Sequence, residues 1–359
     1  MTRPSSRPRA AAVAGSLLVA LSLLSACGGE GGGGRPIEGS DELKALAEAA
    51  QDEGQVVLYT SLTSTTTDKL AAAFQDTYGI RLVVSPVASQ AAGQQKLEQE
   101  IDAGNVQGDV FLNTLDVAWA EEMGASGGLV DVTDLPDIDS LDEEFRSTYY
   151  VAPVLDLAGM AYNPTVLDED DLPDTPEEFL ASDDLRGRTV VLDPEIGGSS
   201  VNVHDVLFDQ LGEQGYDAFV ADLFDELDAD MTTDFGVALT QVSSGEKAAF
   251  WPIPSRGVAP LKASGAPIAM HYFEPVPAVS SAVSVTADGP HPSAGKLLAN
   301  WLMSEEAAEI LCADEAMARP GLDVEGALEL PDGVAFADPA EAATVYEEHV
   351  LPAFAQHAG

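Results

Sequence analysis

A hydroxyl-rich run between a predicted strand and a predicted helix is the first candidate binding site. Thr60, Ser61 and Thr63 follow a β-branched strand and precede an amphipathic helix. Hydroxyls, together with the free N–H groups at the positive end of a helix, suit an anionic or strongly polar ligand. The hydroxyl residues at 64–67 are explained better as caps of that helix. We therefore expect Thr60, Ser61 and Thr63 to line a polar pocket.

A second run of this kind lies in the other half of the chain. Gly198 lets the backbone approach a ligand closely, and Ser199 and Ser200 open a predicted helix. A plain helix cap explains the same pattern, so both explanations stay open. As a ligand site, this run would match the first one from the opposite side.

Further candidates come from the ends of other predicted strands. Arg256 is one of very few cations, and its guanidinium suits a carboxylate or phosphonate, although pairing with the abundant acids explains it equally well. Glu274 is a candidate partner for an ammonium group of a zwitterionic ligand. The remaining candidates are Ser89, Asn113, Thr114, Trp251 and Ser255.

Catalytic patterns are weak. Ser244 and Lys247 form a Ser-x-x-Lys tetrad, the nucleophile motif of penicillin-interactive enzymes, but the companion Ser-Asp-Asn and Lys-Thr-Gly elements are absent. The five histidines are scattered without the spacing of metal ligands. We therefore expect no enzyme, no cofactor and no metal site, with a serine enzyme that uses Ser244 and Lys247 as an alternative.

Short β-rich runs alternate with helical patterns, which is typical of a parallel α/β architecture. Strands are predicted at 55–60, 80–84, 109–112, 188–192, 248–251 and 268–273. Helices are predicted at 41–52, 68–78, 91–103, 200–211, 216–227, 256–263, 293–303 and 305–312. Ligands of such open sheets bind at the carboxyl ends of the strands, where most of the candidate residues lie.

Two extended segments, 150–162 and 278–286, join these α/β sets, so we expect a clamshell that encloses a small molecule by hinge closure. Lobe 1 is predicted to comprise 40–153 plus 280–320, and lobe 2 to comprise 154–279. A C-terminal helical segment, 321–359, is expected to pack on the lobes.

The N-terminus has the features of a secretory signal, with three arginines in the first nine residues and a short apolar stretch at 11–26. The run Leu24-Ser25-Ala26-Cys27 resembles the lipobox of bacterial lipoproteins. This resemblance implies a signal peptide at 1–26 and lipidation of Cys27, followed by a flexible Gly-rich tether at 27–39. We therefore expect the protein outside the cytoplasm, anchored to the membrane through Cys27.

The chain is strongly acidic, with 16 basic and 61 acidic residues. Without the three arginines of the signal, 13 basic residues face 61 acidic ones, a formal charge of −48. Such a charge argues against a nucleic-acid partner, which needs clustered Lys and Arg. It reflects either solubility or adaptation to high salt, where ions screen the self-repulsion.

Several motifs, in this order and spacing, resemble type II solute-binding proteins of ABC importers. They are VVLYTS (56–61), FQDTYGI (74–80), DVF (109–111), GMAYN (159–163), VSSGEK (242–247), HPSAGK (291–296) and NWLMS (300–304). The resemblance implies a two-lobed type II periplasmic-binding-protein fold. It also implies a monomer that delivers its solute to a membrane permease with a cytoplasmic ATPase.

The most similar branch contains ferric-iron-binding proteins and their relatives for phosphonates and other small solutes. In the iron members, a His or Tyr near the first strand and an adjacent Tyr pair in the second lobe hold the metal. This chain has no imidazole at 60–63, directly after Tyr59, and no phenol at 252–256, directly after Trp251. Its adjacent pair, Tyr149 and Tyr150, falls in a different segment. We therefore predict a small anion or zwitterion, such as an organophosphonate, with ferric iron as the alternative.

Overall fold

The computed structural model describes residues 34–196, 198–331, 333–338 and 341–357. Cys27, the predicted signal peptide and the start of the predicted tether lie outside the described residues. In the part that is described, no helix is long and apolar enough to cross a membrane.

Lobe 1 is built around three parallel strands, with β1 in the centre and β2 and β3 on either side. The strands are β1 (Gln55–Thr60), β2 (Arg81–Pro86) and β3 (Val110–Thr114). The helices that connect and extend them are α1 (Asp41–Glu53), α2 (Ser64–Tyr78), α3 (Gln90–Asp102) and α4 (Val117–Ala125). Gly54 and Gly79 end α1 and α2 in the left-handed conformation that glycine adopts without strain.

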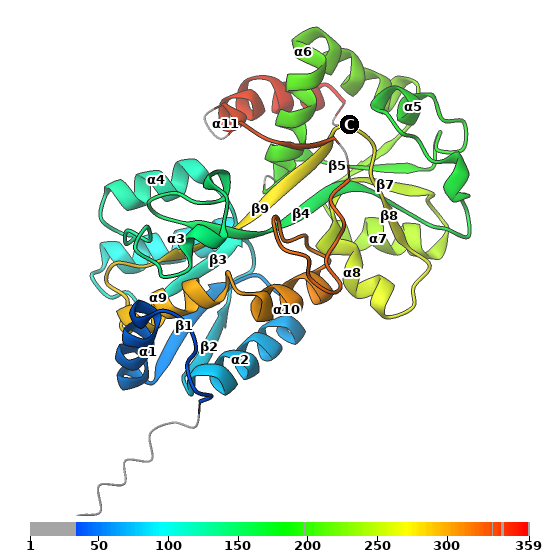
Figure 1. The fold of residues 1–359 in the computed structure, drawn as a ribbon. Coiled ribbons are helices and arrows are strands. Elements are labelled where there is room, and N and C mark those ends of the chain that lie inside the picture. The colour runs from blue at the N-terminus through cyan, green and yellow to red at the C-terminus, as the bar shows by residue number, and fades with distance from the viewer. Residues whose placement is uncertain (1–33, 197, 332, 339–340, 358–359) are drawn as a thin grey trace, which may run out of the picture. The chain divides into compact units, whose positions relative to one another are not determined.

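Two long strands, β4 (Val151–Tyr162) and β9 (Val276–Val285), run between the lobes (Figure 1). They pair antiparallel, with Leu155 opposite Ser280, and β9 also pairs with β3 of lobe 1. Further along, β4 pairs with β7 and β8 of lobe 2. The whole of β4 is buried, as its apolar sequence predicts for a strand covered on both faces.

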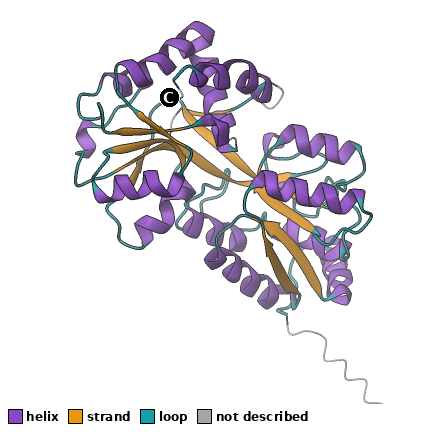
Figure 2. Cartoon of the chain, turned by 180° about the vertical axis from the view of Figure 1, so that it is seen from behind, coloured by secondary structure: helices purple, strands orange, loops and turns teal. Residues whose placement is uncertain are grey.

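Lobe 2 repeats the α/β arrangement, and helices flank the strands of each lobe (Figure 2). Its strands are β5 (Thr189–Leu192), β6 (Asp230–Thr232), β7 (Ala249–Pro254) and β8 (Ala269–His271), with β5 parallel to β6 and β7. Its helices are α5 (Pro176–Ala181), α6 (Ser199–Asp225), α7 (Phe235–Ser244) and α8 (Ser255–Ala263). Gly212 has a positive φ of 66° and a non-helical backbone, so α6 consists of two helices joined at a kink, in agreement with the helices predicted at 200–211 and 216–227.

The chain then returns to lobe 1 and ends on lobe 2. Helices α9 (Pro292–Trp301) and α10 (Glu305–Glu315) pack against α1 and α2. Strand β10 (Val334–Phe336) pairs with the start of β9. The last elements, α11 (Ala342–Val345), a π-helical turn (Tyr346–Val350) and α12 (Leu351–Ala355), pack against α6. Short 3₁₀ turns lie at Ile138–Ser140, Glu143–Phe145, Glu169–Asp171 and Pro194–Ile196.

The full strand order is β2-β1-β3-β9-β4-β7-β5-β6. The predicted two-lobed α/β fold with two extended crossings is confirmed. The predicted lobe boundaries, between residues 153 and 154 and between residues 279 and 280, lie inside β4 and β9. Because these strands run through both lobes without a break, the boundaries stay predictions.

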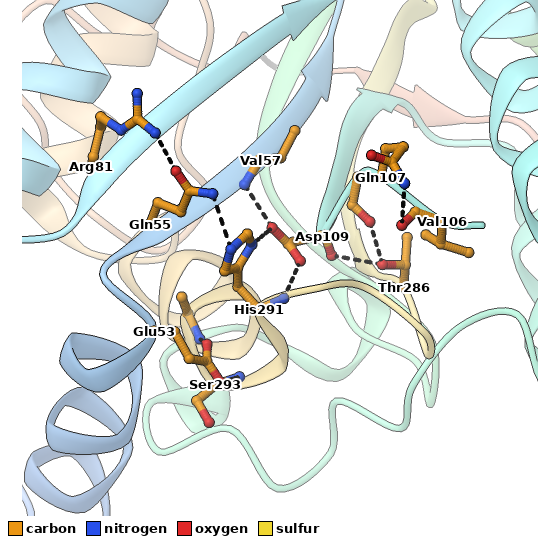
Figure 3. A network of polar contacts seen from close by, with 12 residues as sticks. Glu53, Gln55, Val57, Arg81, Val106, Gln107, Asp109, Thr286, His291 and Ser293 are labelled. Atoms are coloured by element: carbon orange, nitrogen blue, oxygen red, sulfur yellow. Dashed lines mark hydrogen bonds and ion pairs between the residues drawn. The ribbon is translucent and has the colours of Figure 1, made fainter.

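A buried polar network ties the elements of lobe 1 together at the amino ends of its strands (Figure 3). Asp109 accepts hydrogen bonds from Val57 N (2.7 Å), His291 N (2.7 Å) and His291 Nδ1 (2.8 Å). The Oε1 atom of Gln55 accepts from Arg81, so its amide nitrogen donates to His291 Nε2 (3.1 Å). This chain of bonds requires the neutral His291 to carry its proton on Nδ1.

We expect Asp109→Ala to lower the free energy of unfolding by about 3 kcal/mol, because two backbone N–H groups in the interior lose their acceptor. Urea unfolding measures this change. The control is Asp139→Ala, which removes a 92% exposed side chain from an ion pair with Arg146 and should cost less than about 1 kcal/mol. Equal losses in the two variants would show that the network does not hold lobe 1 together.

Candidate functional site

The topology places most of the candidate residues at two sheet edges. Strands β1 and β3 are parallel neighbours, so their carboxyl ends, Thr60 and Thr114, lie at one edge of lobe 1. Strands β5 and β7 are parallel neighbours in lobe 2, and they lead into the amino ends of α6 and α8. Ligand sites of open α/β sheets form at such edges.

At the edge of lobe 1, Ser61 and Asn113 form a pair. The exposed Ser61 hydroxyl donates to Asn113 Oδ1 (2.7 Å). Asn113 is 4% exposed, and its Nδ2 donates to no acceptor among the described residues. Thr60 is buried, and its hydroxyl accepts from Leu62 N (3.2 Å), so it shapes the turn. An amide donor without an acceptor in the protein is the kind of group that a polar solute satisfies.

The amino end of α2 is already occupied by a carboxylate of the protein. Glu315, at the end of α10, accepts from Thr63 N (3.2 Å), Thr63 Oγ1 (3.0 Å) and Thr66 Oγ1. Glu315 is 2% exposed. The expectation that Thr63 offers free donors to an anionic ligand therefore has to be corrected, because Glu315 takes those donors.

At the edge of lobe 2, the amino end of α6 has no side-chain cap among the described residues. Gly198 precedes the helix with a left-handed φ of 68°, and it provides no side-chain cap. Ser200 is 2% exposed, and its hydroxyl has no hydrogen-bond partner within the described ranges. Ser199 is half-buried. Because helix N–H groups favour negative charge, this end suits an acidic group of a ligand.

Arg256 joins the two edges. Its Nη2 donates to Thr114 Oγ1 in lobe 1 (3.0 Å), and its Nε lies 3.3 Å from Asp156 Oδ2 on the crossing strand β4. The Arg256 side chain is 23% exposed, whereas that of Asp156 is 1% exposed. Within the described residues, no hydrogen bond or ion pair joins 198–200 to 60–63, so the contact between Arg256 and Thr114 is what brings the candidates of the two lobes together.

Asp156 lies in an unfavourable environment for a charge. Burial raises the pKa of its carboxyl to about 6, although the Arg256 guanidinium acts in the opposite direction. The carboxylate of Glu315 raises this pKa further. Burial also raises the pKa of the nearby Tyr272 to about 12, whereas the Ser255 hydroxyl acts in the opposite direction.

Ser255 holds the amino end of α8 against the segment that follows α10. Its hydroxyl donates to the carbonyl of Ala316 (2.8 Å) and lies 3.5 Å from Asp156 Oδ1. Ser255 is 1% exposed, so it positions Arg256. Two residues further on, Ala318 exchanges backbone hydrogen bonds with Leu155 of β4.

Three candidates lie away from the contact between Arg256 and Thr114, and their role in binding stays a prediction. Trp251 is 2% exposed, and its ring packs in the core of lobe 2 against Phe219 and Phe273. Glu274 is exposed, and its side chain lies against Gly333 of the C-terminal segment. Ser89 is exposed and caps α3 by accepting from Ala92 N (3.2 Å).

The residues of the alternative catalytic tetrad do not act on each other. The Ser244 hydroxyl donates to the carbonyl of Gln241 (3.0 Å). Lys247 Nζ lies 2.6 Å from Asp230 Oδ2 and donates to the carbonyl of Gly187 (3.0 Å). The serine has no base to activate it in this arrangement.

As for metals, the described residues contain no group of three or more His, Cys, Asp and Glu side chains that could hold an ion.

Sequence reasoning missed Asp156 and Glu315. Asp156 had a signal, because it is the one charged residue in the apolar run 151–162. Glu315 had none, since the acids of α10 look alike in sequence, and the fold alone brings this one to α2.

Comparisons with known proteins agree with this architecture. The family described as bacterial extracellular solute-binding protein matches residues 69–323. No curated protein sequence matches the chain. Iron-bound HitA from Pseudomonas aeruginosa is a similar solved structure, with a TM-score of 0.66 and 20% identity over 82% of this chain and 98% of that one.

Two further structures have the same fold. The periplasmic binding protein AfuA from Actinobacillus pleuropneumoniae, with fructose-6-phosphate bound, has a TM-score of 0.64 and 18% identity over 84% of this chain and 98% of that one. The ferric binding protein from Campylobacter jejuni has a TM-score of 0.64 and 16% identity over 84% of this chain and 99% of that one. At such identities the likeness shows the fold.

We expect Asp156→Asn to change how stability depends on pH. The pKa of Asp156 is about 6 in the folded protein against an ordinary value of 3.8, so the folded state binds more protons than the unfolded state between about pH 4 and 6. This group therefore lowers stability as pH rises through that window, and asparagine removes the effect. Relative to wild type, the variant should gain about 2 kcal/mol between pH 4 and pH 7.

Denaturant unfolding at several pH values measures this difference. Asp139→Asn is the control, because its carboxyl is exposed. Parallel curves for wild type and Asp156→Asn would contradict the prediction.

Proposed function

Because the chain belongs to the bacterial extracellular solute-binding protein family, whose members deliver solutes to ABC importer permeases and are not enzymes, we propose that it captures a small polar solute between its two lobes. The bond from Arg256 to Thr114 carries this proposal, since it links the carboxyl edge of one lobe to that of the other. A solute that contacts both edges stabilises the closed arrangement of the lobes.

The solute is proposed to be a small organic anion or zwitterion, such as an organophosphonate. Two features of lobe 2 support an acidic group. One is the Arg256 guanidinium, and the other is the end of α6, where the described residues provide neither a side-chain cap nor a hydrogen-bond partner for the Ser200 hydroxyl. In lobe 1, Ser61, Asn113 and Thr114 offer neutral polar groups, because Glu315 occupies the helix end there. Arg256 is already paired with the buried Asp156, and the carboxylate of Glu315 adds a second negative charge near Asp156, which favours a zwitterion over a dianion.

The protein is proposed to work as a monomer at the extracytoplasmic face of the membrane, anchored through Cys27. Its permease and the cytoplasmic ATPase of the importer are the protein partners. Two acyl chains on one cysteine give stable membrane attachment, whereas one does not.

Thermal melts of the full-length protein test the solute class. We expect 2-aminoethylphosphonate, at a hundred times its dissociation constant, to raise the melting temperature by about 5 °C, because it binds only the folded state. Arg256→Gln should weaken this binding by about 10- to 100-fold through the loss of a charged hydrogen bond. Lys262→Gln, an exposed cation on the same helix, is the control and should bind like wild type.

The panel should also contain inorganic phosphate, amino acids and ferric citrate. A shift with ferric citrate alone would replace the proposal with the iron-binding alternative. No shift with any compound would contradict capture of a small solute of these classes.

Membrane anchoring has its own test. Cells that express the wild-type chain should retain it in the membrane fraction, and mass spectrometry should find acyl chains on Cys27. Cys27→Ala should move the protein to the soluble fraction, because the acylation site is gone. Ser25→Ala, next to the site, should leave fractionation unchanged. An unmodified Cys27 in the membrane fraction would argue against the lipid anchor.

A further inference from the structure

In the proposed solute site, Asp156 already pairs with Arg256, the cation that would bind an anionic solute. Asp156 lies on β4 with 1% exposure, and its Oδ2 is 3.3 Å from Arg256 Nε. This oxygen has no hydrogen-bond partner among the described residues, whereas the backbone N–H of Arg256 and the Ser255 hydroxyl bond to the Asp156 carboxyl and lower its pKa. The Arg256 side chain meets Asp156 through Nε and donates from Nη2 to Thr114.

The groups around Asp156 come from three elements. Arg256 and Ser255 belong to α8, Glu315 to α10, and Tyr272 to the segment after β8. Arg256 carries the one positive charge, Glu315 carries a second negative charge, and the serine and tyrosine hydroxyls are neutral. Burial with this balance raises the pKa of Asp156 to about 6, so the carboxyl is close to taking up a proton near neutral pH.

We infer that Asp156 is a specificity-determining residue of the proposed solute site: an anion that binds Arg256 replaces Asp156 as the partner of the guanidinium, and Asp156 takes up one proton from solvent. This inference rests on the proposed function. The step forms one ion pair and breaks another, and the proton comes from water or buffer. An anion close to Asp156 is a further negative charge, so it favours the neutral form of this carboxyl.

The affinity for an anion then depends on pH. Above the pKa of Asp156 in the free protein, each unit of pH decrease strengthens binding by up to about tenfold. Below that pKa the carboxyl is already neutral, and the dependence levels off. Asp156 thus keeps anions out when it is charged and admits them when it is protonated.

Calorimetric titration of the full-length protein tests the inference, with 2-aminoethylphosphonate and sulfate as probes at pH 5.5 and pH 7.5. Two buffers of different ionisation enthalpy at pH 7.5 give the number of protons taken up, which should be about one for wild type. Asp156→Asn keeps the shape of the side chain without its charge. It should bind the probes at least tenfold more tightly than wild type at pH 7.5, and its binding should take up one proton fewer.

Protons taken up or released by the phosphonate itself are the same for wild type and Asp156→Asn, so they drop out of the difference between the two proteins. Sulfate does not titrate in this pH range. Asp134→Asn, in an exposed pair with Lys296, is the control and should keep the wild-type pH dependence. Binding with the same pH dependence and proton count in wild type and Asp156→Asn would overturn the inference and leave the proposed function intact. If neither protein binds an anion at either pH, the proposed anion site is wrong, and the inference fails with it.

If Asp156→Asn does not fold, wild type alone decides. Uptake of about one proton with sulfate at pH 7.5 supports the inference. Sulfate binding without proton uptake contradicts it.

Discussion

The antiparallel pairing of β4 and β9 is the constraint on which the rest of the structure depends. Strand β9 pairs with β3 of lobe 1 and β4 pairs with β7 of lobe 2, so the register of β4 against β9 fixes where the lobes meet. Asp156 lies in the middle of this pair, opposite Val279. Its neighbour Leu155 is hydrogen-bonded to Ala318, so the segment after α10 is fastened to the same point. Any movement of one lobe against the other must be absorbed next to these contacts.

Charges buried between β4, α8 and α10 are screened less by solvent than charges on the surface. The chain carries 61 acidic and 16 basic residues, and the exposed charges are screened by water and salt. Asp156 and Glu315 are screened far less, because they are buried. Glu315 is satisfied by three donors from the start of α2. Asp156 has Arg256 as its ion-pair partner. An anionic solute that binds the guanidinium therefore competes with Asp156 for it.

Much of the fold could be predicted from local sequence. The strand at 55–60 and the helix end at residue 78 agree with the prediction, because β-branched runs and a glycine after a helix are local signals. The two crossings were also visible as extended segments at 150–162 and 278–286. Their pairing brings together residues more than a hundred positions apart, which local patterns do not show. The resemblance of the motifs to a known family supplied the two-lobed arrangement.

The site was predictable only in part. Arg256 and Thr114 were chosen separately, from charge and from position at a strand end, and the fold brings them to 3.0 Å. Thr63 and Trp251 were chosen for the same local reasons, but an acid 252 positions away binds one and the aromatic core of lobe 2 buries the other. Long-range packing decides which side chains at the strand ends lie between the two lobes, and local sequence patterns do not show this packing.

The most direct test is a crystal structure of the protein purified with its retained solute, or soaked with a compound that raises its melting temperature. We expect one small molecule between the lobes, in contact with Arg256 and the start of α6 on one side and with Asn113 or Thr114 on the other. A solute enclosed entirely within one lobe, with the bond from Arg256 to Thr114 and the ion pair with Asp156 unchanged, would contradict it.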